Sequence, residues 1–228
     1  MLVSILGDSI STFEGYCYNY PCFYTLETSQ ELGLHDVSDT WWMRLIAARG
    51  WTYLKNSSYS GRKVVDCAFG ALIAEEQAHR LRTNEHDPDV ILIYMGTNDF
   101  ALGVPERWIP RRDREILTFD KAYREMLCRL RNMYPQTKII CGTLMRTTVK
   151  DKPNWTFPNS FGGRPLERYN AEIKRAAQSE NCLVADLEMT NIRYETLDGA
   201  HPTAKGHSDI AEAWNTCLDG DFCDTFML

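Results

Sequence analysis

The chain has 228 residues, of which 44% are hydrophobic and 25% are charged, and its net charge is −6 at pH 7. This length fits one α/β domain around a single core, which we expect to span residues 1–228. The negative charge argues against a nucleic-acid partner, because nucleic-acid binding normally requires a basic face. The chain also lacks a run of about 20 apolar residues, so we expect no membrane-spanning helix.

The amino terminus gives no indication of a leader peptide, because an apolar segment begins at Leu2 without a basic region before it. The eight cysteines show none of the spacings that are typical of metal ligands. We therefore expect a cytoplasmic protein with reduced thiols, with no metal and no other cofactor.

Short apolar runs alternate with segments of helical periodicity along the whole chain. A continuous apolar run such as Val90–Tyr94 indicates a strand that is buried on both faces. In chain order the predicted strands are Leu2–Leu6, Trp51–Asn56, Val90–Tyr94, Lys138–Cys141 and Leu183–Leu187.

Between these strands, apolar residues at helical spacing predict helices that begin at or near Thr40, Val64, Thr118, Tyr169 and Pro202. The helix that begins at Val64 is expected over residues 64–73. The alternation predicts right-handed βαβ connections and a five-stranded parallel sheet with helices on both faces, which is a three-layer α/β/α arrangement.

Three stretches, 11–39, 100–117 and 145–165, do not fit this alternation. Each follows the end of a predicted strand, so we expect them to surround a binding site as walls or as a lid. The first and third are rich in aromatic residues. Those of 11–24 could form a substrate platform or the core of a folded loop, and exposed ones could form the interface of a homo-oligomer.

Polar residues and glycines follow three of the predicted strands. Ser9 follows the first strand, Gly61 the second and Asn98 the third. The carboxyl ends of parallel strands meet at one edge of a sheet, where ligands bind in such folds. Asp198 and His201 lie in Asp-Gly-Ala-His-Pro at a predicted strand-to-helix junction. We expect all five residues to meet at this edge.

Together these residues predict a serine hydrolase. A serine hydroxyl needs a neutral imidazole to accept its proton, and Asp198 is close enough in sequence to orient His201. The backbone N–H groups of Ser9 and Gly61 and the carboxamide of Asn98 are suitable donors to an oxyanion.

Each of these residues also has a structural interpretation, as part of a turn, a helix entry or a cap, but their occurrence together favours catalysis. Asp8 and Asp99 lie beside candidate residues. We expect both to hydrogen-bond to the backbone rather than to act as an acid or a base.

Four blocks resemble those of the SGNH or GDSL hydrolases in the same order: Gly7-Asp8-Ser9, Gly61, Gly96-Thr97-Asn98-Asp99 and Asp198-x-x-His201. The resemblance spans residue 2 to the terminal helix. It implies a flavodoxin-like strand order, 2-1-3-4-5. It also implies that Ser9 is the nucleophile, His201 the base and Asp198 the orienting carboxylate, with oxyanion donors from Ser9, Gly61 and Asn98.

We therefore predict a carboxylic ester hydrolase that removes small acyl groups, acetyl among them, from a hydroxylated small molecule such as an acylated carbohydrate. Lipase, lysophospholipase and thioesterase activities of the same family are alternatives. A binding protein that keeps the fold without catalysis is another, and the acyl group could also pass to an acceptor other than water. The long insertions argue against a wide lipid-binding groove.

Overall fold

The computed structural model describes residues 1–18, 21–67, 72–107, 118–161 and 163–220. Its centre is a parallel sheet of five strands in the order β2-β1-β3-β4-β8, which confirms the predicted sheet and strand order. The strands of the sheet are β1 (Leu2–Gly7), β2 (Thr52–Asn56), β3 (Val90–Tyr94), β4 (Lys138–Gly142) and β8 (Leu183–Ala185).

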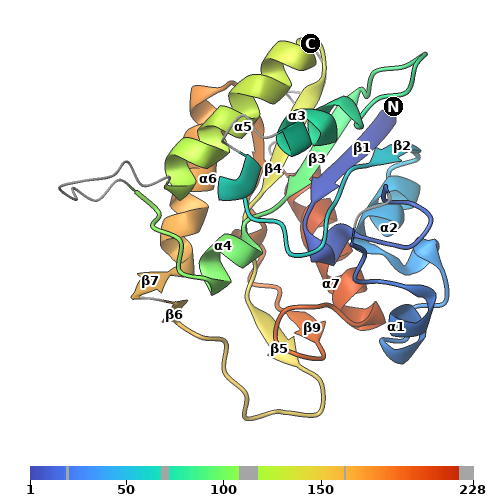
Figure 1. The fold of residues 1–228 in the computed structure, drawn as a ribbon. Helices are drawn as coiled ribbons and strands as arrows, with labels where there is room; N and C mark the ends of the chain where they lie inside the picture. The colour runs from blue at the N-terminus through green and yellow to red at the C-terminus, as the bar shows by residue number, and fades with distance from the viewer. Residues whose placement is uncertain (19–20, 68–71, 108–117, 162, 221–228) are drawn as a thin grey trace.

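Helices cover both faces of this sheet (Figure 1). The α-helices of the described residues are α1 (Leu26–Glu31), α2 (Trp41–Ala48), α3 (Leu72–His79), α4 (Thr97–Ala101), α5 (Phe119–Met133), α6 (Leu166–Ser179) and α7 (Ala204–Asp219). Within that part of the chain, no helix combines the length and the apolar character needed to cross a membrane.

The side chains of β3 alternate between two hydrophobic cores. Val90, Leu92 and Tyr94 pack in one core with α2 and α7, whereas Ile91 and Ile93 pack in the other with α5 and α6. All five residues of β3 are buried. A strand that contacts helices on both faces needs apolar side chains at every position, which explains its continuous apolar run.

One predicted helix begins later than its sequence pattern indicates. Val64 precedes a short 3-10 helix, η3 (Val65–Cys67), and α3 begins only at Leu72, while residues 68–71 lie outside the described part of the chain. The prediction of an α-helix from Val64 is therefore wrong for its first turn. The N–H groups of Val64 and Val65 donate to the carboxylate of Asp99, at 2.7 and 3.2 Å.

The first and third predicted insertions fold beyond the carboxyl ends of the strands, where Figure 1 shows α1 and β5. The insertion 11–39 contains α1, and 145–165 contains β5 (Thr147–Val149), β6 (Ser160–Phe161) and β7 (Arg164–Pro165), the last two paired antiparallel. β5 pairs in parallel with β9 (Tyr194–Thr196). Of the insertion 100–117, residues 108–117 lie outside the described part.

The start of α7 packs closely against β9 at Gly206. A β-carbon on Gly206 would lie 1.9 Å from the backbone oxygen of Glu195 and 2.8 Å from the β-carbon of Pro202. The N–H of Thr203 donates to the same Glu195 oxygen at 3.1 Å. Glycine is therefore required for this close approach, which positions the turn 197–201 between β9 and α7.

We expect Gly206→Ala to lower the free energy of unfolding by about 2–3 kcal/mol, because the backbone must move to admit the methyl group. Urea unfolding measures this change. Gly220→Ala is the control, because its β-carbon would meet its nearest neighbour at 3.7 Å, and its effect should be below about 1 kcal/mol. Equal stability of Gly206→Ala and the unaltered protein would show that α7 can shift away from β9 at no cost.

Candidate active site

Three residues from distant parts of the sequence form a hydrogen-bonded chain at the carboxyl edge of the sheet. His201 Nε2 lies 3.0 Å from Ser9 Oγ, and His201 Nδ1 lies 2.6 Å from Asp198 Oδ2. A proton on Nδ1 satisfies the carboxylate and leaves the Nε2 lone pair free to accept the serine proton. The structure thus brings together the three residues that the sequence indicates as nucleophile, base and orienting carboxylate.

Ser9 lies on a tight turn directly after β1. It is the first residue of a 3-10 helix, η1 (Ser9–Ser11), whose N-cap is Asp8. The carbonyl of Ser9 accepts hydrogen bonds from the N–H of Thr12 at 3.2 Å and from its hydroxyl at 2.9 Å. Ser9 is only 6% exposed. Its hydroxyl is therefore presented on a well-held backbone rather than on a free loop.

The turn that carries His201 is organised by Asp198. Asp198 Oδ1 accepts the N–H groups of Ala200 and His201, at 2.9 and 2.8 Å. Burial raises the pKa of Asp198, but hydrogen bonds from the side chain and backbone of His201 and from Ala200 outweigh this and hold the pKa well below its usual range. Asp198 therefore keeps its negative charge at neutral and moderately acidic pH, where it can stabilise a protonated imidazole.

One face of the His201 ring is covered by Phe23. The two rings are nearly parallel, at 7°, with centroids 3.5 Å apart. The N–H of Phe23 donates to Thr12 Oγ1 at 3.0 Å, so the threonine that contacts the Ser9 carbonyl also anchors this ring. The stack fixes the imidazole plane and places an aromatic face beside a ring that would become positively charged on accepting a proton.

The aromatic residues of 11–24 include one beside the candidate site and others that form part of a core. Phe23 contacts the candidate site, whereas Phe13 and Tyr24 are buried in the core that contains α2 and α7. The hydroxyl of Tyr24 donates to the carbonyl of Pro202 at 2.8 Å, next to His201. Sequence reasoning missed Phe23 as a site residue, because no local pattern distinguishes it from the other aromatic residues of this insertion.

Gly61, Ser9 and Asn98 follow the neighbouring strands β2, β1 and β3, so Ser9 stands between the other two at the sheet edge. Asn98 Nδ2 donates to the carbonyl of Arg62 at 2.9 Å, which ties α4 to the loop after β2. A carboxamide has a second N–H for another acceptor. Gly61 has a φ of +77°, which favours glycine, and apart from its two chain neighbours no atom of the described residues lies within 4 Å of where its β-carbon would be.

Asp8 and Asp99 are buried carboxyl groups beside the site. Burial raises the pKa of each to about 7, although hydrogen bonds from backbone N–H groups oppose the rise. Asp8 accepts the N–H of Ile10 at 3.1 Å, and Asp99 accepts those of Val64 and Val65. The predicted hydrogen bonding of both side chains to the backbone is confirmed.

We expect the stability gained by Asp8→Asn to increase with pH. Folding raises the pKa of Asp8 to about 7, so the folded state favours the protonated carboxyl group. The stability that this group contributes is therefore complete below pH 4, and it is lost as the pH rises through 7. Oδ2 of Asp8 has no hydrogen-bond partner among the described residues, so the buried charge is poorly compensated. Asparagine stays neutral at every pH.

Urea unfolding of both proteins at pH 5 and pH 8 measures this effect. The free energy of unfolding of Asp8→Asn, taken relative to the unaltered protein, should rise by about 2–3 kcal/mol between the two pH values. If the difference in free energy of unfolding between the two proteins is the same at both pH values, the pKa of Asp8 is not raised.

Within the described residues, the structure contains no group of three or more His, Cys, Asp or Glu side chains that could hold a metal ion.

Comparison with known proteins identifies relatives of this chain. Residues 1–157 match the family model of the GDSL-like lipase/acylhydrolases. The chain is 25% identical over 174 residues to a multidomain esterase of Ruminococcus flavefaciens, a match that covers 72% of this chain and 21% of the relative. The matched region is therefore about a fifth of that relative's length.

Solved structures share the fold over nearly the whole chain. A protein named a GDSL-like lipase from Bacteroides uniformis is 25% identical, with a TM-score of 0.67 and 94% of each chain covered. A carbohydrate esterase family 3 protein from Talaromyces cellulolyticus is 19% identical, with a TM-score of 0.57 and 98% of each chain covered. The match over residues 1–157 covers well over half of the sequence, so this chain belongs to the GDSL-like lipase/acylhydrolase family.

Proposed function

We propose that the protein is a serine esterase that cleaves carboxylic esters through an acyl-enzyme. The observation that carries this proposal is the hydrogen-bonded chain from Ser9 through His201 to Asp198. In the first step Ser9 Oγ attacks the ester carbonyl carbon while His201 Nε2 takes its proton. Asp198 holds the ring in the required tautomer and stabilises the imidazolium that forms.

The negative charge on the carbonyl oxygen is stabilised by N–H donors from three strand ends. The donors are the backbone N–H groups of Ser9 and Gly61 and the second N–H of the Asn98 carboxamide. His201 then returns its proton to the leaving alcohol, and the ester bond breaks. Water, activated by the same imidazole, attacks the acyl-enzyme and releases the acid. His201 moves every proton in these reaction steps, so the proposed reaction requires no cofactor.

For the substrate we propose esters of small acyl groups, acetyl among them, on a hydroxylated molecule such as a carbohydrate. The relative named a multidomain esterase and the structural neighbour named a carbohydrate esterase support this direction. So does Phe23, an aromatic ring beside His201. A protein that binds such esters without cleaving them would not need Ser9 and His201 within hydrogen-bonding distance.

Hydrolysis of p-nitrophenyl acetate by the purified protein, together with covalent labelling by a fluorophosphonate probe, tests this proposal. We expect turnover of the ester and labelling at Ser9. A folded protein that neither releases p-nitrophenol nor reacts with the probe would refute it.

We expect Asn98→Ala to lower kcat by about 10²- to 10³-fold, because it removes one donor to the oxyanion while the nucleophile and base remain. Steady-state kinetics with p-nitrophenyl acetate measure this loss. The residual rate should still exceed that of a protein without Ser9. A kcat equal to that of the unaltered protein would mean that Asn98 only anchors the carbonyl of Arg62.

A further inference from the structure

A cavity of about 280 Å³ lies beside the chain of Ser9, His201 and Asp198. Part of its wall is the turn from Asp198 to Ala200, which leads directly into His201, and another part is Thr97, the neighbour of Asn98. The cavity thus contacts both Asp198 and the residue before a proposed oxyanion donor. Its other walls are mainly apolar and aromatic and include Phe100, Leu144, Met145, Trp155, Phe157 and Leu166.

The aromatic wall comes from the insertion 145–165 packed against α4. Phe157 lies parallel to Phe100, with ring centroids 5.8 Å apart and an angle of 9°. Trp155 meets Phe157 edge-on at 6.2 Å and 79°. A β-carbon on Gly199 would lie 3.2 Å from the Trp155 indole, so this ring packs against the turn before His201. The insertion therefore bounds the cavity directly beside the catalytic turn.

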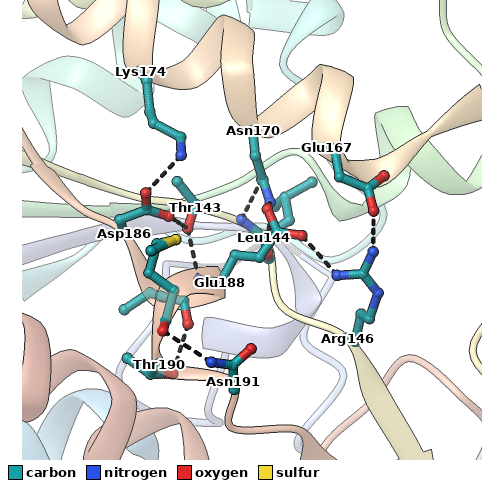
Figure 2. A network of polar contacts seen from close by, with 12 residues as sticks. Thr143, Leu144, Arg146, Glu167, Asn170, Lys174, Asp186, Glu188, Thr190 and Asn191 are labelled. Carbon is teal, nitrogen blue, oxygen red and sulfur yellow. Dashed lines mark hydrogen bonds and ion pairs between the residues drawn. The ribbon is translucent and has the colours of Figure 1, made fainter.

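The wall at Leu144 is held by a network of polar contacts (Figure 2). The buried carboxamide of Asn170 accepts the N–H of Leu144 at 2.7 Å and donates to its carbonyl at 2.9 Å. Asn170 also donates to Glu188 at 2.8 Å, and Arg146 donates to Glu188 at 2.7 Å. These contacts hold the segment after β4 in place, so the wall at Leu144 is formed without a ligand.

We propose that this cavity binds an apolar arm of the ester substrate. By this we mean a straight alkyl chain or a flat aromatic group of about six to eight carbon atoms. The inference rests on the proposed esterase function and adds an apolar arm, on the acid or the alcohol side, to its substrate. A group the size of water occupies about 30 Å³, so the cavity has room for roughly nine such groups, too few for a long lipid chain. Its apolar walls favour methylene or aromatic groups over the hydroxyls of a sugar ring.

The first test is a series of p-nitrophenyl esters with acyl chains from acetate to dodecanoate. Burying each added methylene group should raise kcat/KM about fourfold, which is about 200-fold from acetate to hexanoate. The value should fall again at dodecanoate, whose chain exceeds the cavity. A decline from acetate onward would show that acyl chains do not enter it.

The second test fills the cavity from an exposed position. Ala101, the last residue of α4, lines the cavity and is exposed, so Ala101→Trp should occupy the cavity without disturbing the core. We expect it to lower the ratio of kcat/KM for hexanoate to that for acetate at least tenfold. Leu102→Trp is the matched control, because Leu102 is the next residue, is 69% exposed and does not line the cavity. That ratio should not change in Leu102→Trp.

A parallel series of alkyl acetates, from ethyl to hexyl, shows whether the arm belongs to the acid or to the alcohol. If Ala101→Trp reduces the preference for longer chains among the alkyl acetates but not among the p-nitrophenyl esters, the cavity binds the alcohol side. If it changes neither preference, the proposal is wrong.

Failure of the esterase proposal is detected separately. If the protein hydrolyses no ester, calorimetric titration with hexanoate and with acetate still tests the cavity. Tighter binding of hexanoate, lost in Ala101→Trp and kept in Leu102→Trp, would support it, and equal binding of the two acids would overturn it.

Discussion

Replacing Ser9 with alanine should reduce ester hydrolysis by about 10⁵-fold or more while leaving the protein folded. The large loss is expected because no other hydroxyl is hydrogen-bonded to His201 in the described part of the chain, and without the attacking oxygen no acyl-enzyme can form. The fold should persist because the backbone carbonyl of Ser9, which binds Thr12, is unchanged. Turnover of p-nitrophenyl acetate measures the activity, and thermal unfolding monitored by circular dichroism measures the fold.

Ser29→Ala is the matched control for this substitution. Ser29 is buried like Ser9, at 3% against 6% exposed, and its hydroxyl has no hydrogen-bond partner among the described residues. The same chemical change there should leave kcat and fluorophosphonate labelling unaltered. Near-normal turnover in Ser9→Ala would disprove the assignment of Ser9 as nucleophile, even if the fold were intact.

Replacing Asp198 with asparagine should lower kcat by about 10⁴-fold. Asparagine has nearly the same shape but no charge, so it cannot stabilise an imidazolium at His201, and its N–H₂ group can turn towards Nδ1 and favour the wrong tautomer. Steady-state kinetics with p-nitrophenyl acetate measure the loss. Labelling by the fluorophosphonate probe should slow in parallel, because the attack of Ser9 on phosphorus needs the same base.

Asp151→Asn provides the control for net charge. It removes one negative charge from an exposed position of the insertion 145–165, and its φ of +58° suits asparagine. We expect it to retain normal activity. Because the pKa of Asp198 lies well below its usual range, the carboxylate of the unaltered protein should stay charged across pH 5–8. A loss of less than tenfold in Asp198→Asn would mean that Asp198 only organises the turn.

The local sequence determined the sheet and the positions of the candidate residues. Strands such as Val90–Tyr94 are recognisable because a strand covered on both faces must be apolar throughout, and the alternation with helical segments requires parallel connections. Parallel connections place all carboxyl ends at one edge, so the sequence alone predicts that Ser9, Gly61 and Asn98 meet there. Asp198 and His201 were recognisable from their spacing in one turn.

Only the tertiary structure decided which side chains surround these residues. Phe23 stacks on His201, Asp99 binds the N–H groups of Val64 and Val65, and Trp155 packs beside Gly199. These partners are tens of residues or more apart in the sequence, and no periodicity of 2 or 3.6 residues links them. Periodicity records which face of an element is buried, whereas a contact between two loops depends on where the folded sheet brings their ends.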